Sequence, residues 1–201
     1  MRLFRLKLRG TLLQTDYILE TIEKNYSEHR KKHTFAVCET AQMLARHYGV
    51  DEEKAKIAAL FHDMFRDMPE QTLNAYVRDF NMDDRYYDNV NLAHGKIAAI
   101  IMERDHQIED RDILNAVCYH TTGRPGMSLL EKIIYIADAI EPGRDYPGVE
   151  ELRNLAYQNL DEACLLSMNN TIEYIKERGL FLDEDTIRAK NFLVEGKTND
   201  K

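Results

Sequence analysis

The chain is poor in the residues that interrupt helices and in those that cross-link secreted domains. Its 201 residues include nine glycines, four prolines and three cysteines. Most of the glycines and prolines fall between periodic segments, which is typical of an all-α fold. An odd number of widely spaced cysteines does not suit a disulfide framework, and this favours a reducing cytoplasm.

Long apolar runs and an excess of positive charge are also missing. No stretch approaches the roughly 20 apolar residues that span a bilayer, so we expect no membrane segment. The formal net charge of −8 argues against a protein that coats nucleic acid, although it does not exclude a phosphate substrate. Residues 1–16 are basic but lack the apolar core of a signal peptide. We interpret them as an N-terminal extension, with a mitochondrial presequence as the less favoured alternative.

The length and the periodic segments predict one bundle of helices over residues 17–193, followed by a polar tail at residues 194–201. Gly49 and Gly179 are well placed as C-terminal helix stops, and Ser128 with Glu131 forms a capping-box signature. The expected helices cover residues 17–48 (with a break allowed near 25–27), 52–63, 69–80, 92–104, 110–120, 129–140, 149–157, 160–178 and 183–193.

The most informative residues are His62 and Asp63, which close an apolar helical run that begins at Ala55. Burying a charged group is costly unless it is paired or coordinated. Asp138 has the same problem inside the apolar run 133–140, where no lysine or arginine lies one helical turn away. A divalent cation would satisfy both sites, so the sequence predicts a metal-dependent hydrolase.

Six candidate metal ligands lie inside or beside expected helices. They are His33, His62, Asp63, His94, His120 and Asp138. A nitrogen-rich His/Asp set without thiolate suits iron, manganese or zinc better than magnesium. Two such ions about 3.5–4 Å apart can stabilise the attacking and the leaving oxygen of a phosphoryl transfer. His29 belongs to a polar run, and we interpret it as a surface residue.

Arginines lie close to these ligands in the sequence. Arg30 precedes His33, Arg66 follows Asp63 by three residues, and the loops after the last two ligands carry Arg124 and Arg144. The planar guanidinium binds two phosphate oxygens at once. We therefore expect a phosphate-binding role, with a solvated surface charge as the alternative for each arginine.

These motifs resemble the HD-domain superfamily of metal-dependent phosphohydrolases, and more narrowly its YqeK family of symmetrical diadenosine-tetraphosphate hydrolases. The resemblance covers roughly residues 17–193. It rests on segments 28–33, 58–63, 94–95, 120–127 and 134–144. The last two segments are the more specific, because they place the same loop chemistry after two separate ligands.

The resemblance implies a di-metal centre, with iron as the expected metal and manganese or another transition metal as the alternative. One ion would be bound by His33, His62, Asp63 and Asp138, and the second by His94, His120 and the shared Asp63. Asp63 and Arg66 are expected to be catalytic; the family usually has lysine in place of Arg66. The residues expected to meet the polyphosphate are Arg30, Arg66, Thr121 and Arg144, and we add Arg124 from its place in the loop after His120.

The expected reaction is attack on an inner phosphorus of diadenosine tetraphosphate, which yields two molecules of ADP. An HD hydrolase acting on another nucleotide, such as a nucleoside di- or triphosphate, a monophosphate or a cyclic dinucleotide, remains an alternative. A nucleotide sensor without turnover is a second, although the complete ligand set speaks against it. An oxygen-activating di-iron oxygenase is a third, and the arginines speak against that. A homodimer is compatible with the family.

Overall fold

The computed structural model describes residues 17–24 and 26–199, and in these residues it contains helices and no strand. The expectation of an all-α fold is therefore confirmed. The basic segment 1–16 and the last two residues of the tail lie outside the described residues. Across the part that is described, none of the helices has the length and apolar character needed to cross a membrane.

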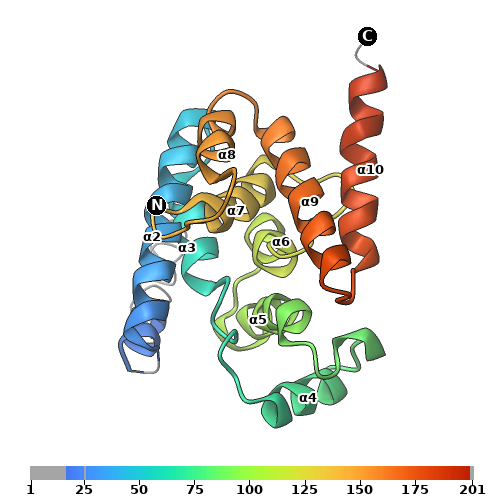
Figure 1. The fold of residues 1–201 in the computed structure, drawn as a ribbon. Helices are drawn as coiled ribbons and strands as arrows, with labels where there is room; N and C mark the ends of the chain where they lie inside the picture. Colours follow the sequence, from blue (N-terminus) through green and yellow to red (C-terminus); the bar gives the residue numbers. More distant parts are fainter. Residues whose placement is uncertain (1–16, 25, 200–201) are drawn as a thin grey trace.

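The described part of the chain begins with a helix at residues 17–24, and ten further elements follow within it (Figure 1). They are α2 (Glu28–Tyr48), α3 (Glu52–Phe61), α4 (Glu70–Asp79), the 3₁₀ helix η1 (Asp84–Tyr86), α5 (Val90–His106), α6 (Arg111–Tyr119), α7 (Leu129–Ile140), α8 (Val149–Ala156), α9 (Leu160–Glu177) and α10 (Glu184–Asn199).

Capping residues explain most of these boundaries. Asp51 accepts hydrogen bonds from the first turn of α3, and Gly49 ends α2 in the left-handed conformation at φ 70°. The capping box at Ser128 and Glu131 is formed as expected. α10 differs from the expectation, because it continues six residues beyond Leu193 to Asn199. No proline interrupts this stretch, so the helix continues into the segment interpreted as a tail.

α7 is the central helix of the bundle. It packs against α2, α3, α6, α8 and α9, and Figure 1 shows α6 and α7 between the α2–α3 pair and the α9–α10 pair. Ile133, Ile134 and Ile136 of α7 are completely buried. A smaller apolar cluster joins α4 to α5 through Leu73 and Ile97. The packing brings the C-terminal ends of α3, α6 and α7 close to one another.

Candidate metal centre

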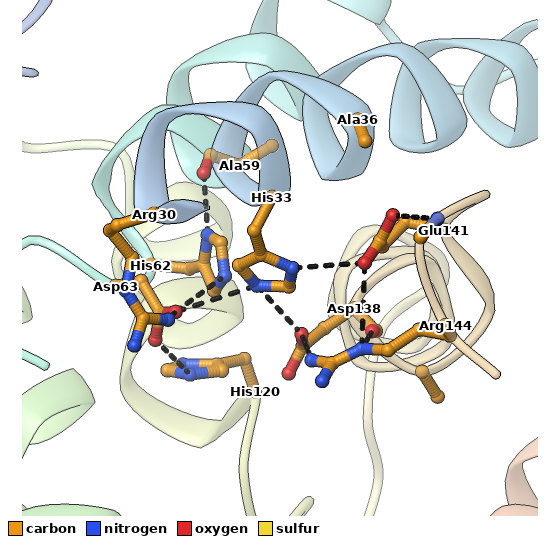
Figure 2. Close-up of polar contacts among 12 residues, drawn as sticks. Arg30, His33, Ala36, Ala59, His62, Asp63, His120, Asp138, Glu141 and Arg144 are labelled. Carbon is orange, nitrogen blue, oxygen red and sulfur yellow. Dashed lines mark hydrogen bonds and ion pairs between the residues drawn. The ribbon is translucent and has the colours of Figure 1, made fainter. Parts of the chain in front are cut away.

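All six expected ligands meet where these helices converge, and Figure 2 shows them apart from His94. His33 lies on α2, His94 on α5 and Asp138 on α7, and the other three follow α3 or α6 directly. Within each of two groups, one donor atom per residue lies within 4.8 Å of the others. The groups are His33, His62 and Asp138, and Asp63, His94 and His120. The Asp138 side chain is 25% exposed, and the other five residues are buried.

Asp63 belongs to the group with His94 and His120, and it also faces the other group. Its Oδ2 atom is 3.4 Å from Nε2 of His33 and 3.6 Å from Nε2 of His62. Its Oδ1 atom is 3.1 Å from Nε2 of His94. Because each oxygen faces a different group, this carboxylate is placed to bridge two cations.

The backbone orients three of the histidine rings. The Nδ1 atoms of these rings lie 2.6–2.7 Å from backbone carbonyl oxygens. The pairs are His62 with Ala59, His94 with Val90, and His120 with Val117. A carbonyl oxygen only accepts, so each Nδ1 carries the hydrogen and each neutral ring presents the lone pair of Nε2 to the centre.

These lone pairs fit a bound cation. Nε2 of His94 lies 2.9 Å from Nε2 of His120, and two acceptors at that distance repel unless a positive charge lies between or beside them. Nε2 of His62 is buried and has no hydrogen-bond partner among the described residues. The donor set of imidazole nitrogen and carboxylate oxygen is the one that transition metals prefer. The residues present therefore fit a pair of divalent metal ions.

Comparison with known proteins identifies the family. The HD-domain family model matches residues 30–143, which is more than half of the chain and includes all six candidate ligands. The chain belongs to the HD-domain family.

The relatives of this HD domain place it in the YqeK family. A symmetrical bis(5'-nucleosyl)-tetraphosphatase of Bacillus subtilis is 40% identical over 89% of this chain and 96% of its own length. A relative with the same name from Halalkalibacterium halodurans is 39% identical over 88% of this chain and 95% of its own length. The crystal structure of a predicted HD superfamily hydrolase involved in NAD metabolism, from Clostridium acetobutylicum, is 43% identical and has a TM-score of 0.85, covering 90% of this chain and 97% of that one.

The electrostatics of this HD domain keep most ligands in the form that binds metal. Burial raises the pKa of Asp63 and Asp138, but the neighbouring His62 and His33 outweigh it and hold both carboxyl pKa values well below their usual range. Burial, together with His94 and His62, lowers the pKa of His120 to about 3. Burial also lowers the pKa of His33, yet its hydrogen bonds to Asp138 and Asp63 raise it to about 9. His33 thus carries the proton that a metal ion must displace.

Two of the expected phosphate-binding arginines contact the carboxylate ligands. Arg30 forms an ion pair with Asp63 and is held from the other side by Asp67, 2.9 Å away (Figure 2 shows the contact with Asp63). Arg144 pairs with the carboxylate of Asp138 and donates to its backbone carbonyl at 2.8 Å. One guanidinium therefore stands beside each of these two ligands.

The other expected substrate residues differ in their surroundings. The Arg66 side chain is half-buried and makes no hydrogen bond or ion pair within the described part of the chain. The Thr121 hydroxyl lies 3.2 Å from Nε2 of His120. Arg124 instead binds the buried Glu131 through two nitrogens, at 2.6 and 2.8 Å. Its guanidinium is therefore engaged in holding the start of α7.

Sequence reasoning missed two acidic residues at the centre. Asp67 supports Arg30, and Glu141 accepts from Nδ1 of His33 at 3.2 Å. Glu141 follows Asp138 by three residues and is buried. It was missed because a glutamate at the end of a helix is ordinarily a surface residue. His29 is exposed, as expected.

Proposed function

We propose that this chain hydrolyses diadenosine tetraphosphate symmetrically and releases two molecules of ADP. The observation that carries the proposal is the bridging position of Asp63 between two His/Asp groups, with Arg30 and Arg144 beside the carboxylates. The name shared by relatives that are about 40% identical over nearly the whole chain supports the same activity and substrate.

The six ligands would hold two ions. His33, His62 and Asp138 would bind one and His94 and His120 the other, with Asp63 shared between them. We propose iron as the native metal, with manganese or another transition metal as a substitute. The nitrogen-rich set favours transition metals over magnesium, and iron is the metal that the resemblance to the YqeK family implies. Two bound divalent ions activate water and offset charge on the phosphoryl oxygens. Backbone carbonyls hold three of the four histidines as the tautomer that presents Nε2, and five of the six candidate ligands are buried away from bulk water.

The arginines and Thr121 would bind the polyphosphate. Arg30 and Arg144 each have a second anchor apart from the ligand carboxylate, Asp67 and the Asp138 carbonyl. Each would therefore stay in place when a cation takes over its carboxylate partner. Arg66, whose side chain makes no ion pair with the described residues, would be available to bind a phosphate. Electrostatic stabilisation by such preorganised charges is usually the largest single contribution to catalysis. Arg124 has no part in the proposal, because Glu131 already binds it.

Product analysis tests the proposal. The protein is purified without oxygen, loaded with ferrous iron or manganese, and given diadenosine tetraphosphate; the nucleotides are then separated by chromatography. We expect ADP as the sole product and its loss on chelation. AMP with ATP would refute the attack position. No cleavage by the metal-loaded protein would refute the activity and direct attention to other nucleotides or to a sensor.

Two histidines of α2 provide the matched variants. His33→Ala removes a buried ligand, whereas His29→Ala removes an exposed histidine four residues earlier on the same helix. We expect turnover to be lost in the first variant and retained in the second. Similar activity in both would remove His33 from the centre.

A further inference from the structure

His33 differs from the other three ligand histidines in what holds its ring. The Nδ1 atoms of His62, His94 and His120 face backbone carbonyls. Nδ1 of His33 faces a carboxylate oxygen, Oε1 of Glu141, at 3.2 Å (Figure 2). Because this carboxylate is an ionised acceptor, it holds the Nδ1 hydrogen more strongly than a carbonyl does and makes the ring a more basic ligand.

The surroundings of Glu141 are built to place its carboxylate. Glu141 is only 4% exposed, and its Oε2 atom accepts the backbone N–H of Gly143 at 2.5 Å. A Cβ at position 143 would lie 2.9 Å from Oε2 and 3.1 Å from Oε1. Glycine is therefore required at position 143, because a larger side chain would collide with the Glu141 carboxylate around which the turn closes.

Arg153 of α8 secures the backbone of the same turn. Its guanidinium donates to the carbonyl oxygens of Ile140, Glu141 and Arg144 at 2.8–2.9 Å. These are carbonyls at and just beyond the end of α7, where no helical partner is available. The position of Glu141 is thus fixed by contacts with Gly143 and Arg153 that do not involve His33, and its Oε1 atom also lies 3.8 Å from Nε of Arg144 in an ion pair.

We propose that Glu141 is a positioning residue which sets the metal affinity of the His33, His62 and Asp138 group through His33. It is not a ligand in this proposal, and the group of Asp63, His94 and His120 does not depend on it. The inference rests on the two-metal centre of the proposed function. It adds that the two sites differ in how their histidines are held. In the first site a side chain holds His33 and a backbone carbonyl holds His62, whereas in the second site backbone carbonyls hold both histidines.

The variant Glu141→Gln probes this role with little change in shape. The carboxylate accepts from both His33 and Gly143, but an amide offers one acceptor for these two donors. If the amide oxygen serves Gly143, its NH₂ group faces Nδ1 of His33 and favours the tautomer with hydrogen on Nε2. That tautomer has no lone pair for a metal at Nε2.

Two further variants separate positioning from general stability. Gly143→Ala keeps Glu141 but pushes its carboxylate, since the new Cβ would meet both carboxylate oxygens. Glu131→Gln alters a buried carboxylate at the other end of α7, which also accepts a backbone N–H and binds an arginine. Thermal unfolding of the metal-free variants checks that each one folds.

The measurement is an isothermal calorimetric titration of metal-free protein with Mn²⁺. We expect two bound ions per wild-type chain. Glu141→Gln should weaken one site by about 10–100-fold and leave the other within about twofold. Gly143→Ala should weaken the same site, and Glu131→Gln should weaken neither. Excess Mn²⁺ should restore the turnover of Glu141→Gln, which a purely structural defect would not allow.

The outcomes distinguish this inference from the proposed function. If wild-type protein binds two ions and Glu141→Gln keeps both affinities, the role of Glu141 is refuted and the two-metal centre stands. If wild-type protein binds both ions but does not cleave diadenosine tetraphosphate, the proposed substrate is refuted, and a weakened site in Glu141→Gln still supports the inference. Failure of the wild type to bind metal would overturn both.

Discussion

Nε2 of His94 and Nε2 of His120 lie 2.9 Å apart, and each ring is held through its Nδ1 hydrogen by a backbone carbonyl. Neither ring can turn its lone pair away without losing that hydrogen bond. With both Nε2 atoms as acceptors, the two lone pairs repel each other, and a cation bound between or beside them would remove that repulsion.

The first prediction concerns metal and stability. An ion present at 100 times its Kd stabilises the folded chain by about 2.7 kcal/mol if it does not bind the unfolded one. For a chain of this size, that corresponds to a rise in Tm of about 5–10 °C. Thermal unfolding with Mn²⁺ and then with excess chelator measures the difference. Identical midpoints under the two conditions would contradict a metal centre.

The second prediction concerns the bridge. Asp63→Asn keeps the shape of the side chain but removes the charge that both groups face, so we expect both ions to be bound more weakly. Turnover should fall by at least about 10²-fold, because metal ions supply several kcal/mol of transition-state stabilisation. Asp67→Asn is the control. It alters an exposed aspartate beside the same arginine, and it should leave the metal content at two ions per chain.

The third prediction concerns Arg66, whose side chain is half-buried and makes no ion pair with the described residues. Arg66→Ala should leave the Tm within about 2 °C, since surface substitutions away from specific contacts change stability by only about 0.5 kcal/mol. It should raise the KM or lower the kcat by about tenfold, as one charge-assisted hydrogen bond is lost. Arg66→Lys should recover most of this activity. Unchanged kinetics for Arg66→Ala would exclude Arg66 from substrate binding.

The fourth prediction concerns the contact between α5 and α6. A Cβ at Gly95 would lie 2.7 Å from the carbonyl oxygen of Val117 and 2.9 Å from the His120 ring. Gly95→Ala should therefore destabilise the protein by about 1–3 kcal/mol and displace a ligand, although alanine favours helices. Gly196→Ala is the matched control, because a Cβ at this helical glycine meets nothing within 4 Å. It should stabilise the protein slightly. Urea unfolding and metal content measure both effects, and a stable Gly95→Ala protein with two ions would contradict the prediction.

The sequence predicted the helices and the ligands for a common physical reason. Helical periodicity and capping residues such as Asp51 and Ser128 are local, so they can be read without knowing the fold. His62 and Asp138 stood out because their polar side chains lie in apolar runs, where an uncompensated charge is costly. The structure brings both to one centre, together with the four ligands expected beside them.

The pairing of charged residues was beyond local reasoning. Arg124 follows a ligand just as Arg144 does, yet the first binds Glu131 at the start of α7 and the second contacts Asp138. The sequence shows that both residues are cationic, but only the packing of helices decides which carboxylate each one meets. Glu141 was missed for the same reason, because its partner His33 lies 108 residues earlier in the chain.

Three helices have their C-terminal ends at this centre, and this arrangement affects the order in which metal and nucleotide bind. The carbonyl end of a helix carries a partial negative charge, and α3, α6 and α7 all bring that end to the two carboxylates, Asp63 and Asp138. This end of the three helices therefore attracts cations and repels a polyphosphate until metal is bound. We expect metal to bind first and nucleotide second. The affinity of the protein for ADP should therefore increase with the fraction of its metal sites that are occupied.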